Sequence, residues 1–367
     1  MYKQPYVIPD IEIYRDRDRL TIILDNGKKD IYRLYVGSTP EAAAVNKLIC
    51  NSETGTFSVL LPVSEGPYYF MIKSDRFSTN IFSERVIPLN QAINVRDMGG
   101  YETYDGRFVK WGLLYRGDHL MKLDNQDIAL LEKMKVRTVI DYRSSHEQTV
   151  YPNKHIPGVE KVIQCDPKST FSEAAANAVD LQSENVKLVN SLINGEVDPR
   201  FINDKGENVI LGYKELITSE TAKEAYRAFF QICADTENAP LIHHCRGGKD
   251  RTGIGAMFLL LALGVKEEDI IQDYIITGEI RKERNQVKYE QYLKLTNNKN
   301  YLDYLMTVLA TRAEFIEAAI TMVKEMYGTI EDYMIQHLGL TNEQLDNMRK
   351  YYLEEGVSCQ AKGVSSG

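Results

Sequence analysis

The sequence lacks a paired-cysteine framework, a long apolar run and an excess of positive charge. Its five cysteines include no closely spaced pair, which argues against a disulfide scaffold and against a zinc cluster. No stretch approaches the roughly 18 uninterrupted apolar residues of a membrane-spanning helix, and residues 1–20 lack the apolar core of a signal peptide. We therefore expect a cytoplasmic protein without stable membrane insertion. A signal removed beforehand would leave export open.

The net charge of −8 works against nucleic-acid binding, because that binding depends on many cationic contacts to phosphate groups. Any phosphate that the protein recognises must therefore be held by a local site. An apolar content of 43% is typical of a packed soluble protein, and 367 residues exceed one average domain. Such a chain needs no metal or cofactor to hold its core. Its composition leaves the oligomeric state open.

Residues 1–88 show the pattern of an all-β unit. Short alternating runs (LTIIL, IYRLYVG, TFSVLLPV and YYFMIKS) are separated by turn residues. Among these, Asn26-Gly27 predicts a two-residue β-hairpin. We expect a small β-sandwich domain of the immunoglobulin or fibronectin type, acting as a structural or docking module.

Residues 89–356 alternate strands and helices. The near-continuous apolar runs in VRTVIDYR and APLIHHC are typical of buried parallel strands, and LDNQDIALLEKMK predicts a helix capped by Asp124. The segment DGRFVKWGLLYRGDHL suggests a short hairpin, and most of the remainder shows helical spacing. This order predicts an α/β domain with a parallel sheet flanked by helices. The tail, residues 357–367, is expected to be disordered.

One loop in this domain carries residues suited to phosphate chemistry. The strand APLIHHC runs directly into RGGKDRTG and then into the apolar helix IGAMFLLLALG. Cys245 thus lies at the carboxyl end of a parallel strand, where α/β sheets bind ligands. Gly247 and Gly248 free the backbone to curl, so that several N–H groups and the start of the next helix converge on one point. We expect an anion cradle of the size of one phosphate.

Within this cradle, each residue type has a chemical use. Cationic neighbours and backbone dipoles stabilise the Cys245 thiolate, which is the form that attacks phosphorus. The planar guanidinium of Arg251 can bind two phosphate oxygens, and Thr252 can hydrogen-bond the departing thiolate. His244 is expected to orient the loop. A redox role is a minor alternative, because no resolving cysteine lies nearby in the sequence. The predicted phosphate-binding residues are Arg246, Gly247, Gly248, Lys249 and Thr252.

The loop HCRGGKDRTG closely resembles the HCxxGKDRTG signature of bacterial tyrosine phosphatases, the group with the secreted lipid and tyrosine phosphatases of Listeria and Mycobacterium. NVRDMGGY, GLLYRGDHL and VIDYRSSHE are similar to further motifs of that family, in the same order. Together the motifs span about residues 95–253, with Val95 and Tyr142 as mild departures. The resemblance implies a tyrosine-phosphatase-like fold, no metal or cofactor, and a covalent phosphocysteine intermediate.

The general acid of such a reaction stays open between several aspartates. Asp141 ends a parallel strand and should face the same rim as Cys245, and the resemblance also points to it. A structural pairing of Asp141 with Arg143 is equally compatible with the sequence. Asp250 lies within the loop itself, and Asp166 and Asp180 are further candidates.

These features predict a phosphate monoester hydrolase, most simply a protein tyrosine phosphatase with dual-specificity or phosphoinositide activity. Its partners would be a phosphorylated protein or a phosphoinositide. Lys249 adds a second cation to the loop, as in phosphatases that act on inositol lipids. The alternatives are an inositol polyphosphate phosphatase and an inactive phosphate-binding scaffold. The intact Cys245, Arg251 and Thr252 argue against the scaffold, because a pure binder needs no thiolate.

Overall fold

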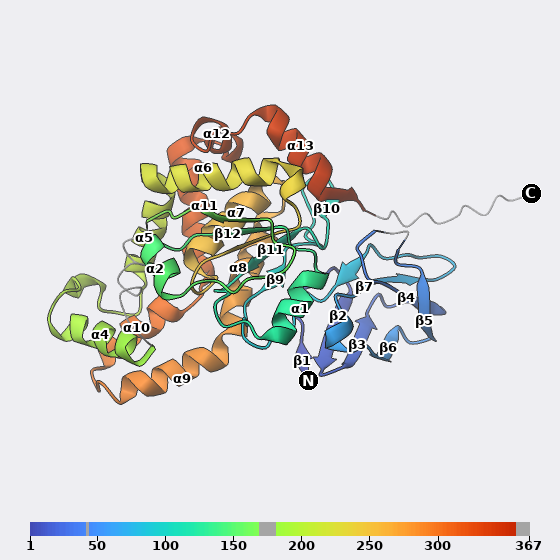
Figure 1. Ribbon diagram of the computed structural model, residues 1–367, viewed down its shortest axis with the longest axis horizontal. Coiled ribbons are helices and arrows are strands. Elements are labelled where there is room, and N and C mark those ends of the chain that lie inside the picture. The colour runs from blue at the N-terminus through green and yellow to red at the C-terminus, as the bar shows by residue number, and fades with distance from the viewer. Residues whose placement is uncertain (42–43, 169–180, 357–367) are drawn as a thin grey trace, which may run out of the picture.

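The computed structural model describes residues 1–41, 44–168 and 181–356. Asp180 and the tail at 357–367, for which the sequence makes predictions, lie outside these ranges. A β-rich N-terminal part stands beside a larger part in which helices surround a central sheet (Figure 1).

The N-terminal part consists of two packed antiparallel sheets. One sheet has the order β1 (Tyr2–Lys3), β2 (Ile11–Asp16), β3 (Arg19–Leu24) and β6 (Thr56–Leu60). The other has the order β5 (Lys47–Ser52), β4 (Tyr32–Gly37), β7 (Tyr69–Lys73) and β8 (Phe82–Ser83). Alternate residues of β2, β3 and β4 are buried in a shared core, as in a β-sandwich.

The two-residue hairpin predicted at Asn26-Gly27 is wrong. Strand β3, which precedes it, pairs with β2 and β6, whereas β4 belongs to the opposite sheet. Gly27 does adopt a left-handed backbone with φ of 65°. The turn signal therefore marks a crossing between sheets, and local chemistry could not distinguish the two connections.

The central sheet of the larger part is mainly parallel. Its order is β13 (Lys161–Gln164), β12 (Thr138–Asp141), β14 (Leu241–His244), β11 (Leu114–Gly117) and β9 (Arg96–Asp97), and only β9 runs antiparallel to its neighbour. Strand β14 is buried along its whole length between β11 and β12. Its end, and therefore Cys245, lies at the middle of the sheet edge.

Neighbouring residues of β14 enter different cores, because side chains alternate along a strand. Leu241 packs in the main core with the helices of one face, and Ile242 packs in a smaller core with α1 (Asn125–Lys133). Helices therefore cover both faces, unequally, and the predicted α/β class with a preceding β-sandwich is confirmed.

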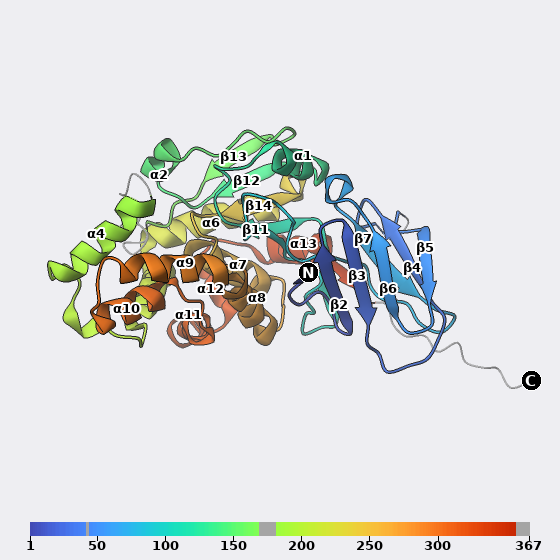
Figure 2. The same cartoon turned by 90° about the horizontal axis from the view of Figure 1, so that it is seen from below.

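The other helices follow in chain order, with the thick layer formed mainly by those after residue 206. Their bounds are α2 (Ser145–Val150), α4 (Leu181–Ile193), α5 (Glu207–Thr218), α6 (Glu220–Ala234), α7 (Asp250–Ala262), α8 (Glu267–Ile280), α9 (Lys282–Leu293), α10 (Lys299–Leu309), α11 (Ala313–Tyr327), α12 (Ile330–Gln336) and α13 (Asn342–Tyr352). Helices α4, α9 and α10 share a separate small core and lie at the end of the molecule away from the sandwich (Figures 1 and 2). No helix in the described ranges is long and apolar enough to cross a membrane.

The hairpin expected within residues 105–120 does not form. β10 (Arg107–Val109) pairs with β15 (Leu353–Glu355) from the far end of the chain, and β11 joins the central sheet instead. The sequence shows that both segments are extended. Their partners are set by long-range contacts that carry no local signal.

The sandwich and the larger part share a polar junction. The guanidinium of Arg85 is fully buried between the rings of Tyr101 and Trp111, with its central carbon 4.1 and 4.6 Å from the ring centres. It donates hydrogen bonds to the carbonyl oxygens of Tyr6 and Asp97, at 2.9 and 2.8 Å. The Trp111 side chain itself belongs to the sandwich core.

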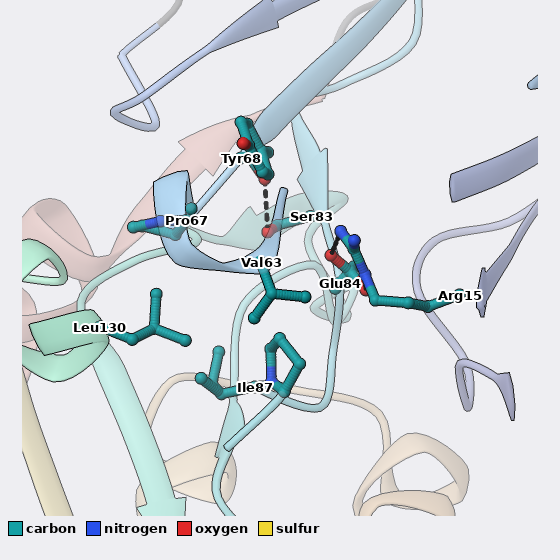
Figure 3. A pocket seen from close by; sticks show the side chains of 10 residues that line it. Arg15, Val63, Pro67, Tyr68, Ser83, Glu84, Ile87 and Leu130 are labelled. Atoms are coloured by element: carbon teal, nitrogen blue, oxygen red, sulfur yellow. Dashed lines mark hydrogen bonds and ion pairs between the residues drawn. The ribbon is translucent and has the colours of Figure 1, made fainter. Parts of the chain in front are cut away.

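A second contact joins the sandwich to α1. Figure 3 shows a cavity of about 20 Å³ at this contact, with Leu130 of α1 on one side and the Arg15–Glu84 ion pair on the other. Arg15 and Glu84 lie 2.5 Å apart and are both almost buried. A void of this size holds about one water molecule. The two parts are therefore packed directly on each other.

Candidate active site

The phosphate-binding loop predicted from the sequence connects β14 to α7. Cys245 is 3% exposed, and its Sγ accepts a hydrogen bond from the backbone N–H of Gly248 at 3.3 Å. Gly248 has a left-handed φ of 67°, and a Cβ there would lie 2.6 Å from Asn94 Nδ2. The loop can therefore adopt this curl only with glycine at this position.

Side chains from distant segments hold the loop carbonyls on its outer side. Asn94 Nδ2 donates to the carbonyl oxygens of Gly247 and Gly248 at 3.1 and 3.3 Å. Arg116 Nη2 donates to Gly248 O at 2.9 Å, and Arg281 Nη1 donates to Gly247 O at 3.2 Å. With the carbonyls bound outside, the N–H groups of the loop are available to an anion inside it.

A buried charge network supports these contacts. Asp273 pairs with Arg96 at 3.0 Å and also with Arg116, and all three side chains are at most 1% exposed. Burial acts to raise the pKa of Asp273, but Arg116 and Arg96 hold it well below its ordinary range. Arg96 Nη1 donates to Asn94 Oδ1 at 2.6 Å, which turns the Asn94 amide nitrogen toward the loop. Sequence reasoning missed Asn94 and Asp273, which no motif identifies as loop supports.

Arg251 lies at the start of α7 and is almost completely buried. Its Nη1 and Nη2 donate to the two carboxylate oxygens of Glu147, at 2.7 and 3.0 Å, and Nη1 also donates to Tyr142 O at 3.0 Å. Burial opposes the charged form, but Glu147 and Cys245 raise the pKa of Arg251 above its ordinary value. Glu147 thus fixes the plane of the guanidinium, a role that its place in VIDYRSSHE does not reveal.

His244 supports the loop from beneath Cys245. Its Nδ1 lies 3.0 Å from Cys245 O, and its Nε2 lies 3.0 Å from Asn153 Nδ2. These partners assign the neutral tautomer with hydrogen on Nδ1, because the carbonyl accepts and the amide nitrogen donates. Burial also lowers the pKa of His244. The expected orienting role fits this position.

Asp141, one of the predicted acids, does not line the cavity above Cys245. Its carboxylate accepts from Arg143 Nε and Nη2, at 2.9 and 2.7 Å, and from Asn153 Nδ2 at 3.1 Å. Burial acts to raise its pKa, but His244 and Arg143 hold the pKa below its ordinary value. Asp141 is fully buried. The structure therefore places it as a partner of Arg143, the second reading that the sequence allowed.

Asp250 does line the cavity. Its Oδ1 accepts a hydrogen bond from the Tyr213 hydroxyl at 2.9 Å and lies 3.4 Å from Lys249 Nζ. Lys249 also lines the cavity, but its Nζ donates to Val308 O and Ala310 O at 2.5 and 3.1 Å. Lys249 therefore ties the loop to the end of α10 as well as placing positive charge beside it.

The remaining predicted loop residues are close together as expected. Arg246 lines the cavity and pairs with Glu184 at 2.9 Å. Thr252 Oγ1 is buried and has no hydrogen-bond partner among the described residues, which fits a hydroxyl kept for the thiolate. The cavity has a volume of about 1380 Å³ and is walled by the loop and by α4, α5, α9 and α10. In the described part of the chain, no group of three or more His, Cys, Asp or Glu side chains could hold a metal ion.

Comparisons with known proteins agree with this geometry. A model of the tyrosine phosphatase family matches residues 87–354. A Mycobacterium tuberculosis protein named triple specificity protein phosphatase PtpB is 27% identical over 272 residues, 70% of this chain and 95% of its own. A Cupriavidus necator protein named as a tyrosine-protein phosphatase is 25% identical over 264 residues, 71% of this chain and 85% of its own.

The chain therefore belongs to the tyrosine phosphatase family, and the predicted enzyme class, a phosphatase, is confirmed. A solved structure of Pseudomonas aeruginosa TpbA also matches, with a TM-score of 0.21 and 14% identity, over 59% of this chain and 91% of that one.

Proposed function

We propose that the chain hydrolyses phosphotyrosine in proteins through a phosphocysteine intermediate on Cys245. The observation that carries the proposal is the shared cavity of Cys245 and Arg251, at the floor of a loop whose carbonyls are all held outside. A phosphate seated there would meet the loop N–H groups and the guanidinium together.

In the first step, Cys245 Sγ attacks phosphorus in line and forms the S–P bond, while the bond from phosphorus to the leaving oxygen breaks. Arg251 and the loop N–H groups stabilise the equatorial oxygens. In the second step, water attacks the phosphocysteine and releases phosphate, and Thr252 donates a hydrogen bond to the departing sulfur. His244 keeps the loop in register throughout.

We assign the acid–base role to Asp250. Both contacts that described residues make with its carboxyl group fall on Oδ1, so Oδ2 is the oxygen that can carry the proton. Asp250 protonates the leaving oxygen in the first step and takes a proton from water in the second. Asp141 is fully buried and paired, whereas Asp250 faces the cavity.

Leaving-group dependence tests this assignment. Loss of a general acid costs on the order of 10²- to 10⁴-fold in rate, and the loss is largest for a poor leaving group. Asp250→Asn should therefore slow phenyl phosphate hydrolysis far more than para-nitrophenyl phosphate hydrolysis. Asp141→Asn and Asp166→Asn are the matched controls. If Asp166→Asn alone shows this difference, the assignment to Asp250 is wrong.

The substrate preference needs a direct comparison. A cavity of about 1380 Å³ is larger than the 300–1,000 Å³ typical of small-ligand sites, so it admits more than one phosphotyrosine side chain. The name of the Mycobacterium relative describes three specificities. Phosphoinositides are therefore the second candidate substrate. Phosphotyrosine peptide, phosphatidylinositol phosphates and inositol hexakisphosphate should be assayed side by side.

The scaffold alternative is tested by turnover itself. Cys245→Ser should lose activity on para-nitrophenyl phosphate while keeping the fold. A wild-type protein that binds phosphate esters but hydrolyses none of them would favour the scaffold.

A further inference from the structure

A second group of cations lies beside the phosphate loop. Arg281 stands where α8 meets α9, and Arg284 and Lys288 follow on α9. The Arg281 guanidinium lies directly on the loop, since a Cβ added to Gly247 would be 2.7 Å from its Nη1. All three side chains line the same cavity as Cys245. They therefore border the position of a bound phosphate ester without belonging to the loop.

Arg284 is not fully paired among the residues that the structure describes. Its Nη1 is buried and has no hydrogen-bond partner there. Burial, and then the neighbouring Arg281, lower the pKa of Arg284 to about 10. Two guanidinium groups thus stand close together in a partly desolvated place, an arrangement that an anion between them would stabilise.

The carboxylates nearby do not balance these cations. Glu184 accepts from Arg246 at 2.9 Å and from Lys288 at 3.3 Å. Asp118 faces Arg281 and Arg284, and burial raises its pKa to about 6. Four cations (Arg246, Arg281, Arg284 and Lys288) therefore meet two carboxylates on this wall, in a chain whose net charge is −8.

One phosphate ester does not account for this wall. The loop N–H groups and Arg251 already surround a single phosphate. Arg281 and Arg284 are positioned for an anion beyond it, on the side of Gly247.

We propose that Arg281 and Arg284, assisted by Arg246 and Lys288, form a subsite for a second phosphate on the same small substrate molecule. The inference rests on the proposed function of Cys245 and extends it to a substrate class, the bis-phosphorylated small alcohol. Because Arg281 hydrogen-bonds the loop residue Gly247, the two phosphates must be close, as on neighbouring or nearby carbons of one ring. A planar guanidinium suits each phosphate through paired N–H donors.

The test compares substrates that differ by one phosphate. One arm uses inositol monophosphate and inositol bisphosphates, and the other uses the corresponding dioctanoyl phosphatidylinositol phosphates, so that free and lipid-attached rings are distinguished. We expect the wild type to prefer the bisphosphate in at least one arm. Arg284→Met should lower the bisphosphate-to-monophosphate ratio of kcat/KM by roughly 10- to 100-fold, the range of one charge-assisted contact.

Two further variants separate binding from folding. Lys282→Met removes the same charge from an exposed position of α9 and should leave the ratio unchanged. Arg284→Lys should recover part of the preference, because it restores the charge without the planar fork. An equal loss on both substrates in Arg284→Met would assign Arg284 a purely structural role and overturn the inference. A preference confined to doubly phosphorylated peptides would overturn it too.

The two proposals fail differently. Binding to Cys245→Ser, measured by calorimetry, should show the same dependence on Arg284. Arg284-dependent binding of bisphosphate by a wild-type protein without turnover would overturn the proposed chemistry of Cys245 and support the subsite. Turnover of monophosphates without any bisphosphate preference would do the reverse.

Discussion

Glu147 should control catalysis without touching the substrate, because it orients Arg251. The pair is bidentate, with contacts of 2.7 and 3.0 Å, and the two side chains are 5% and 2% exposed. Glu147→Gln keeps the shape and can accept one of the two hydrogen bonds, but it turns an amide N–H₂ toward the guanidinium. It thereby removes one charge-assisted hydrogen bond, worth about 1.5–3 kcal/mol.

Part of that energy should appear in the transition state, where Arg251 must hold a fixed plane against the phosphate. We expect kcat/KM for para-nitrophenyl phosphate to fall by roughly 10- to 100-fold. Arg251→Lys disrupts the same bidentate pair, so the two substitutions should be strongly non-additive in a double-mutant cycle. Thermal unfolding of each variant reports the accompanying loss of stability.

Glu147 also caps α2, and this second role needs its own control. Ser144 Oγ accepts from Glu147 N at 3.2 Å, and Glu147 Oε2 accepts from Ser144 N at 2.9 Å. Ser144→Ala removes the first of these contacts without touching Arg251 and should cost about 1 kcal/mol of stability. It should change kcat/KM by less than about threefold. The reasoning is refuted if Glu147→Gln keeps wild-type kcat/KM, or if its effect adds fully to that of Arg251→Lys.

Two further predictions concern the loop and its surroundings. Gly248→Ala should lower kcat/KM by about 100-fold, because its Cβ would meet Asn94 Nδ2 at 2.6 Å and displace the loop. Gly106→Ala, at a similar φ of 85° with open space around it, should keep activity, and equal losses would contradict the steric argument. Burial raises the pKa of Asp118 from 3.8 to about 6, so the folded state binds more protons than the unfolded state in this window and loses stability as pH rises. Asp118→Asn should abolish that loss, with a gain over the wild type of about 3 kcal/mol at most at pH 7 relative to pH 4. Urea unfolding at both pH values measures the difference, and an equal difference at both would show that Asp118 does not titrate as described.

The candidate acid shows where reading along the chain reaches its limit. Asp141 ends β12, and the rule that strand ends meet at one rim places its backbone correctly beside β14. The direction of its side chain depends on Arg143 and Asn153, which bind it beneath the rim. The pairing with Arg143 was visible in the sequence as an alternative. The choice between the two required the position of Asn153, because a strand pattern does not place the loop that follows it.

The support of the loop was hidden for the same reason. Asn94, Arg116 and Arg281 all donate to carbonyls of Gly247 or Gly248, although they lie far from these glycines in the chain. Each looks ordinary in its own segment. Their common task appears only when β9, β11 and α8 are assembled around β14.

From the sequence alone, the nucleophile, the clamp and the class of chemistry could be predicted, because Cys245 to Thr252 form one continuous loop whose geometry follows from its own glycines and the next helix. The α/β class followed likewise from local periodicity. The tertiary structure decided which aspartate faces the cavity, which side chains hold the carbonyls outside and where further cations gather. Those outcomes depend on strand order and helix packing, which bring together residues that no local pattern connects.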